Sequence, residues 1–233
     1  MGLSPPILVG RERGSSMIKR HPTMTTELNP QLPAGLDSID DVSRRHRPFD
    51  EAGVQRAVQD MLRALGENPD REGLRDTPRR IAQMYGEIFA GLDMDPAEYL
   101  SVQFGNGHDE MVILRDIPFY SMCEHHFLPF HGVAHVGYIP EGRVVGISKI
   151  ARVVEGFAKR PQLQERLTAQ VADCIMKAVN PDGVAVVVEA EHLCMTMRGV
   201  RKPGSRMVTS AMRGGFRKQP VTRAEFLSLV QKG

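Results

Sequence analysis

The chain has 233 residues, of which 41% are hydrophobic and 25% are charged, as in ordinary globular proteins. No apolar run reaches the roughly 18–20 residues of a membrane helix, and no secretory signal is visible, so we expect a cytoplasmic protein with no membrane partner. The formal charge of +2 comes from residues 1–48, and the neutral remainder does not indicate a nucleic-acid binder. Three cysteines do not indicate a disulfide framework.

Composition and periodicity divide the chain into two parts. Residues 1–48 mix Pro, Gly, Ser and charged residues without periodicity, and we expect a disordered N-terminal extension there. One domain is expected over residues 49–233, with a helical part at 49–110 and a core at 111–233. In the helical part, apolar residues recur at helical spacing from Val54 to Leu65 and again from Ile81 to Phe89, with Thr77 as the expected N-cap of the second helix.

The core begins with short strand-like runs after Met111 and continues with two helical patterns, over residues 147–160 and 162–179. A long strand is expected over residues 184–200, where the even positions change from valine to His192, Cys194 and Arg198. Strands followed by helices and another strand predict an α+β domain with a largely antiparallel sheet.

Residues 121–130, "SMCEHHFLPF", raise the question of a metal site. Cys123 and His126 offer two ligands, and Cys194 can supply a third from the expected final strand. Two thiolates and one imidazole favour zinc, and three protein ligands leave a fourth position for water. A lone C-x-x-H pattern is weak evidence for a metal site, and Cys194 could equally be a packed strand cysteine.

Two further groups have both a functional and an ordinary explanation. Ser148, Lys149 and Arg152 at the start of a helix could bind phosphate, or could form a solvated basic face. Arg198, near the end of the strand expected over residues 184–200, would add positive charge if that end lies near this helix start. Glu165 at a helix start could accept hydrogen bonds from guanine, or could simply be favoured there by the helix dipole.

Taken together, seven ordered stretches resemble the GTP cyclohydrolase I family. They are "DTPRRIAQMY", "MCEHHFLPFHG", "GISKIARVVE", "RPQLQERLT", "VVVEAEHLCMTMRGV", "VTSAMRG" and "TRAEFL". They run from about residue 76 to residue 227. "CEHH" alone is a modest signal, whereas the full ordered set is highly specific.

The resemblance implies roles for individual residues. The implied zinc ligands, for one Zn²⁺ per subunit, are Cys123, His126 and Cys194. The implied catalytic residues are His125, His192 and Ser148. The implied substrate contacts are Glu165 and Gln164 for guanine, Lys149, Arg152 and Arg198 for the triphosphate and ribose, and Arg80 for phosphates of a neighbouring subunit's substrate.

The resemblance also implies the tunnelling fold, in which antiparallel strands and paired helices assemble into a toroidal homodecamer of two pentamers, with sites at subunit interfaces. The implied reaction is zinc-dependent hydrolytic opening of the imidazole ring of GTP at C8, release of formate and rearrangement to 7,8-dihydroneopterin triphosphate, the first step of folate and pterin biosynthesis. Two alternatives remain: another tunnelling-fold pterin or deazapurine enzyme, or a zinc-stabilised oligomer without catalytic activity.

Overall fold

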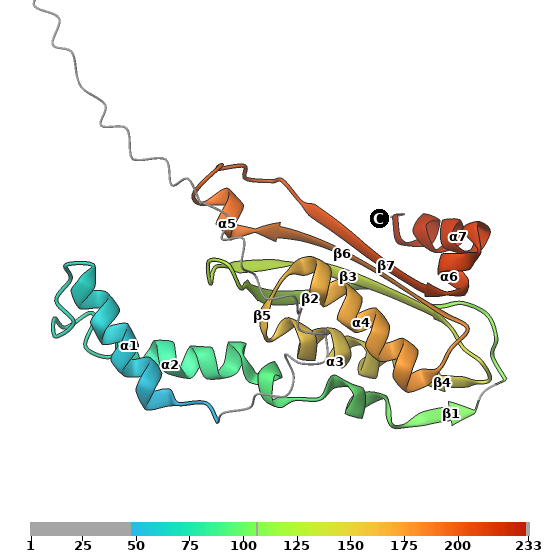
Figure 1. The fold of residues 1–233 in the computed structure, drawn as a ribbon, viewed down its shortest axis with the longest axis horizontal. Helices are drawn as coiled ribbons and strands as arrows, with labels where there is room; N and C mark the ends of the chain where they lie inside the picture. The colour runs from blue at the N-terminus through green and yellow to red at the C-terminus, as the bar shows by residue number, and fades with distance from the viewer. Residues whose placement is uncertain (1–47, 106, 232–233) are drawn as a thin grey trace, which may run out of the picture. The chain divides into compact units, whose positions relative to one another are not determined.

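The computed structural model describes residues 48–105 and 107–231, and these all belong to one of the two units into which the chain divides (Figure 1). The extension expected over residues 1–48 therefore lies, apart from residue 48, outside the described residues. Among the residues that the structure describes, no helix combines the length and the apolar character needed to cross a membrane.

The helices are α1 (Glu51–Ala64), α2 (Thr77–Ile88), α3 (Ile147–Ala158), α4 (Gln164–Val179), α5 (Leu193–Thr196), α6 (Gly215–Lys218) and α7 (Pro220–Gln231), with short 3-10 helices η1 (Ala90–Asp93) and η2 (Pro96–Leu100). The strands are β1 (Gln103–Gly105), β2 (Val112–Cys123), β3 (Pro129–Ile139), β4 (Arg143–Val145), β5 (Pro161–Gln162), β6 (Gly183–His192) and β7 (Met207–Gly214). The four helices predicted from apolar periodicity, α1 to α4, are confirmed.

The two N-terminal helices begin at aspartates. The Asp50 side chain accepts a hydrogen bond from the backbone N–H of Gly53 and so caps α1. The expected N-cap of α2 was wrong by one residue, because Asp76 holds that position and Thr77 is already helical. Pro78 is consequently the second helical residue. The first N–H groups of a helix have no acceptor within the helix, so the N–H that proline lacks costs no hydrogen bond there.

A five-stranded sheet in the order β5-β2-β3-β6-β7 forms the centre of the core. The pairs β2–β3, β3–β6 and β6–β7 are antiparallel, and the short β5 runs parallel to β2. The expected α+β class with a largely antiparallel sheet is therefore confirmed. Helices α3 and α4 lie together on one face of the sheet, and α6 and α7 lie at its other face (Figure 1).

Alternation along the strands explains how both faces are covered. In β3 and β6 the even positions, such as Val136 and Val186, belong to the large core beneath α3 and α4. Odd positions of β6 point the other way, and Ala185 and Val187 pack with Phe216 and Phe226 from the C-terminal helices. The sheet thus has an apolar layer on each face. The polar residues described below lie at the strand ends near the β2–β3 connection.

The long strand expected over residues 184–200 was wrong beyond His192. Both neighbouring strands stop there, since the last β3–β6 pair is Phe130 with His192 and the last β6–β7 pair is Ala190 with Met207. With no strand beside them, the backbone groups of this segment form hydrogen bonds within the segment. The N–H of Met197, for example, donates to the carbonyl of Leu193 at 3.1 Å. The residues after His192 therefore form α5 and do not continue the alternation.

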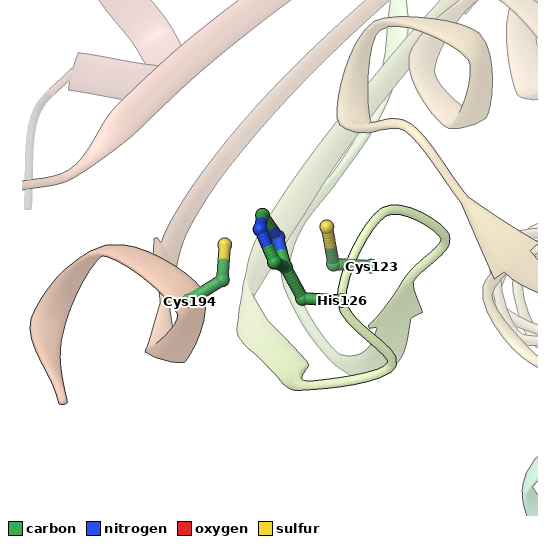
Figure 2. Close-up of side chains that lie close together, drawn as sticks. All are labelled: Cys123, His126 and Cys194. Carbon is green, nitrogen blue, oxygen red and sulfur yellow. The ribbon is translucent and has the colours of Figure 1, made fainter. Parts of the chain in front are cut away.

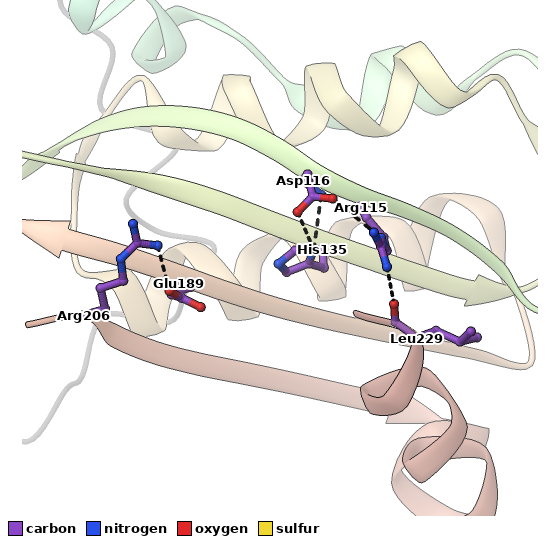
Figure 3. A network of polar contacts seen from close by, with 6 residues as sticks. All are labelled: Arg115, Asp116, His135, Glu189, Arg206 and Leu229. Carbon is purple, nitrogen blue, oxygen red and sulfur yellow. Dashed lines mark hydrogen bonds and ion pairs between the residues drawn. The ribbon is translucent and has the colours of Figure 1, made fainter. Parts of the chain in front are cut away.

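A polar network on the odd face involves a bulge in β2 (Figure 3). The pairing of β2 with β3 shifts between Leu114 and Ile117, and Asp116 adopts a left-handed φ of 54°. The backbone N–H of Asp116 donates to Nδ1 of the buried His135 at 3.2 Å, and Arg115 donates to the carbonyl of Leu229 in α7. The neutral form of His135 therefore stabilises the bulge by accepting this hydrogen bond. The bulge is next to Arg115, whose side chain contacts α7.

We expect His135 to make the stability of the fold depend on pH. Burial lowers the pKa of His135, and the nearby Asp116 carboxylate opposes that effect in part. Unfolded chains bind the proton more readily, so this contribution is complete above the unfolded value of 6.5 and is lost as pH falls through the lowered pKa. Between these values stability should fall by up to about 1.4 kcal/mol per pH unit.

The variant His135→Asn tests this expectation, because an asparagine oxygen can still accept the Asp116 N–H but does not titrate. Thermal unfolding of both proteins from pH 8 down to about pH 5 should give midpoints that diverge, with the wild type losing more on acidification. Parallel curves would show that His135 does not couple protonation to folding.

Candidate active site

Three potential metal ligands from two distant segments converge at the end of the sheet. Cys123 is the last residue of β2, His126 lies in the connection to β3, and Cys194 lies in α5. Their ligand atoms all lie within 4.8 Å of one another. Figure 2 shows the three side chains pointing into one space, with Cys194 on one side and Cys123 and His126 on the other. These residues form a group that could hold a metal ion.

The β2–β3 connection is a tight turn, and its geometry selects one of the two adjacent histidines. The N–H of Phe127 donates to the carbonyl of Cys123, and Phe127 has a left-handed φ of 51°. The rings of His125 and His126 are 84° apart in orientation, with centroids separated by 6.3 Å. His126 belongs to the metal-binding group and His125 does not. The exposed His125 lies beside that group.

The donor set fits zinc in number and in kind. Zinc–sulfur bonds of about 2.3 Å and zinc–nitrogen bonds of about 2.0 Å place tetrahedral ligand atoms within about 4 Å of one another, which agrees with the observed grouping. Burial and the nearby Cys123 thiol raise the pKa of Cys194, because two thiolates this close repel each other. A bound cation removes that repulsion, so the chemistry of the pair favours a metal.

His192 lies beside this group at the end of β6. Its ring stacks on Phe130 with a centroid separation of 4.5 Å and an angle of 1° between planes. Its Nε2 lies 2.7 Å from Oε1 of Gln164, the first residue of α4. Burial lowers the pKa of His192, and the neighbouring Glu165 carboxylate opposes this in part. Glu165 itself is exposed on the first turn of α4.

An ion pair joins the β2–β3 connection to the start of α4. Arg166 donates from Nη1 and Nη2 to the two carboxylate oxygens of Glu124, at 2.6 and 2.8 Å. Both side chains are partly buried, and the Arg166 guanidinium lowers the pKa of Glu124. Because Glu124 lies between Cys123 and His126, this pair fixes the metal-binding turn relative to the helix that carries Glu165.

We expect Arg166→Met to weaken metal binding. The change removes both hydrogen bonds and should cost about 1–2 kcal/mol of stability, together with an approximately tenfold loss of zinc affinity. Arg213→Met is a matched control, since Arg213 makes a similar double contact with Asp173 of the same helix, at 2.6 and 3.1 Å. Competition with a zinc-binding dye should show weaker zinc binding in Arg166→Met alone, and equal affinities in the two variants would contradict the prediction.

The basic residues predicted for phosphate binding occupy two separate places. Arg198, just after α5, lies with its Nη1 3.2 Å from Nε2 of His126 and is thus next to the metal-binding group. Ser148, Lys149 and Arg152 lie on the first turns of α3, which begins at Ile147 close to the predicted point. The expected helical spacing of Lys149 and Arg152 is confirmed.

The two basic places do not converge within one chain. The C-terminal end of α3 lies near the metal-binding turn, since Ser121 Oγ donates to the carbonyl of Ala158 at 2.7 Å. Ser148 is ten residues earlier, about 15 Å away along the helix axis at 1.5 Å per residue. The start of α3 directly follows β4 in the chain, and β4 lies far from α5 (Figure 1). Arg80, on α2, is exposed and pairs with Asp76 at 3.5 Å.

The Glu124–Arg166 ion pair and the contact of Gln164 with His192 were not predicted from the sequence. Each residue type is ordinary at its position, and no spacing rule joins residues that are 42 or 28 positions apart. Cys174, on α4, packs against the core, and burial raises its pKa to about 11.

Comparison with known proteins identifies the family of the chain. The family model of GTP cyclohydrolase I matches residues 54–231. A GTP cyclohydrolase 1 of Dehalococcoides mccartyi is 65% identical over 185 residues, which cover 78% of this chain and 98% of that protein. Those of Pelotomaculum thermopropionicum and Mycolicibacterium vanbaalenii are 64% and 61% identical over 78% of this chain, and 98% and 91% of their own lengths are covered. The chain therefore belongs to the GTP cyclohydrolase I family.

Proposed function

We propose that the protein converts GTP into 7,8-dihydroneopterin triphosphate, by hydrolytic opening of the imidazole ring at C8, release of formate and rearrangement of the ribose. The observation that carries this proposal is the group of Cys123, His126 and Cys194 beside His192, in a chain that the family model matches over residues 54–231. The product would supply folate or another pterin.

We propose that Cys123, His126 and Cys194 hold one Zn²⁺. When bound, zinc supplies the Lewis acidity that makes water a nucleophile near neutral pH. Among the described residues the group contains three protein ligands, as catalytic zinc sites do, whereas structural sites usually contain four. This count favours a catalytic role over a zinc-stabilised oligomer without activity.

His192 and His125, which lie beside the metal-binding group, are suited to moving protons. His192 is partly buried, and its ring is held between Phe130 and Gln164, so it would donate a proton to the purine nitrogen that becomes basic as the ring opens. His125 is exposed on the metal-binding turn and would position water or accept its proton. Each positioned proton transfer contributes about 10²–10⁴-fold to a rate.

Substrate binding is assigned to charged groups near the metal-binding group and, from a neighbouring copy of the chain, at the start of α3. Glu165 presents an exposed carboxylate that would accept the two adjacent donors of guanine, its ring N–H and its amino group. Lys149, Arg152 and Arg198 would bind the triphosphate and ribose, and Ser148 would assist the ribose steps. Arg80 would reach the phosphates of a substrate held by a neighbouring subunit.

We further propose that one site is assembled from more than one copy of the chain, within a homodecamer of two five-membered rings. The support is the separation of the basic residues of α3 from the metal-binding group, which lie toward opposite ends of that helix. A neighbouring copy that presents the start of its α3 to the metal-binding end of this chain would bring the triphosphate contacts to the reacting ring.

The direct test is incubation of the purified protein with GTP, with and without a chelator. We expect formate and 7,8-dihydroneopterin triphosphate in equal amounts, loss of both with the chelator, and recovery with added zinc. A zinc-loaded protein that leaves GTP intact would overturn the proposed function. Another tunnelling-fold enzyme would also leave GTP unchanged and would release no formate.

A further inference from the structure

Gln164 is almost completely buried, although it lies next to the exposed Glu165. Its side chain is 1% exposed. Its Nε2 donates to the backbone carbonyls of Met207 at 2.9 Å and Val188 at 3.1 Å, and Thr209 Oγ1 lies 3.2 Å from the same nitrogen. Its Oε1 lies 2.7 Å from His192 Nε2. Both ends of the amide are therefore occupied by protein atoms.

These contacts determine which way the amide faces and which nitrogen of His192 carries hydrogen. Backbone carbonyls only accept hydrogen bonds, so the amide nitrogen must face Val188 and Met207. The amide oxygen then faces His192, and since that oxygen also only accepts, Nε2 of His192 must be the donor. In the neutral ring the lone pair is consequently on Nδ1.

The surroundings allow the pair little freedom to rearrange. Phe130 fixes the plane of the His192 ring by parallel stacking. Thr168 Oγ1 donates to the backbone carbonyl of Gln164 at 2.7 Å, and it lies 2.6 Å from Thr209 Oγ1. Val188 and Thr209 are direct partners in the β6–β7 ladder. The start of α4 is thus attached to two strands, and the amide is held where it meets His192.

We propose that Gln164 is a positioning residue, which holds His192 in the Nε2–H form, directs Nδ1 toward the substrate and does not itself contact guanine. This inference rests on the proposed function, in which His192 transfers a proton to the purine. The proton is carried on Nδ1 and leaves from it, while the hydrogen bond from Nε2 to Gln164 is the same before and after the transfer. The ring therefore does not need to turn during the reaction.

Neutron diffraction from deuterated, zinc-loaded wild-type protein tests the assignment without any measurement of turnover. We expect deuterium on Nε2 of His192, directed at Gln164 Oε1, and two deuterium atoms on the amide nitrogen that faces Val188 and Met207. Nε2 without deuterium, or an amide turned the other way, would overturn the proposal whether or not the protein acts on GTP.

A double-mutant cycle tests whether Gln164 acts through His192. Gln164→Leu should lower kcat by about 10- to 100-fold and leave KM for GTP unchanged. In a His192→Ala background the same change should have no further effect on the residual rate. Equilibrium binding of GTP to His192→Ala and to the double variant should also be equal. A higher KM or Kd on loss of Gln164, or full additivity of the two losses, would indicate direct contact with guanine and refute the proposal.

Gln170→Leu is the matched control for loss of a buried glutamine from α4. Its Oε1 accepts a hydrogen bond from Gln162 at 2.9 Å, whereas the hydrogen-bond partner of His192 in the described part of the chain is Gln164. We expect this variant to lose a similar amount of thermal stability and to keep its kcat. An equal fall in kcat for Gln170→Leu would show that the effect of Gln164→Leu is a general loss of packing, and would overturn the positioning role.

Discussion

Replacement of Cys194 with alanine is expected to remove zinc from the protein and to lower formate release by about 10²–10⁴-fold. A Lewis-acidic metal contributes several kcal/mol to transition-state stabilisation, and each 1.36 kcal/mol corresponds to a tenfold change in rate. The loss should be this large because Cys123 and His126, both on one turn, leave only two ligands when Cys194 is gone. Zinc content by mass spectrometry and formate release are the two measurements.

Cys174→Ala provides the control for this experiment. Cys174 is the other helical cysteine, and it packs against the core under the sheet and does not belong to the metal-binding group. The control should retain one zinc ion per chain and the wild-type rate. A Cys194→Ala protein that keeps both its zinc and its turnover would contradict the assignment of Cys194 as a ligand.

Mixing two inactive variants is expected to restore activity, which is the second large effect. One variant carries Cys194→Ala, and the other carries Lys149→Ala with Arg152→Ala. If a site uses α3 of one copy and the metal-binding group of its neighbour, random mixing in equal amounts leaves about one quarter of the sites with both parts intact. Formate release should then rise from near zero to about one quarter of the wild-type rate after co-expression or joint refolding.

The control for complementation is a mixture of Cys194→Ala with Cys123→Ala. These residues belong to the same group within a single chain, so no arrangement of copies should rebuild it unless ligands are shared between subunits. This mixture should remain inactive. Equal recovery in both mixtures, or none in the first, would show that the two parts of the site do not come from neighbouring copies in the proposed way.

Expectations that depended on periodicity were the most reliable for the fold. The helices at Glu51–Ala64 and Gln164–Val179 follow from apolar residues at helical spacing, because burying one stripe of a helix needs no knowledge of its partner. The alternation in β6 likewise predicted a strand. Its end could not be predicted, since it depends on where β3 and β7 stop, and the sequence after His192 contains no proline or turn signal before Gly199.

The metal-binding group of Cys123, His126 and Cys194 illustrates the same division. Cys123 and His126 are linked by a spacing that a tight turn can use, so their pairing is visible in the sequence. Cys194 does join this group, but the reason given for expecting it was partly wrong, because it reaches the group from a short helix and not from the face of an extended strand. The contact of Gln164 with His192 has no sequence signal, and the buried amide could equally have served the packing of α4.

The sequence by itself determined the family, the class of fold and the residue types of the site. These depend on local periodicity and on ordered motifs, which can be recognised without a three-dimensional structure. Only the tertiary structure decided which side chains share a space and which hydrogen atom lies between them. Hydrogen bonds and metal coordination act over about 3 Å, and separations that small between residues tens of positions apart are set by strand register and helix docking, which no single segment specifies.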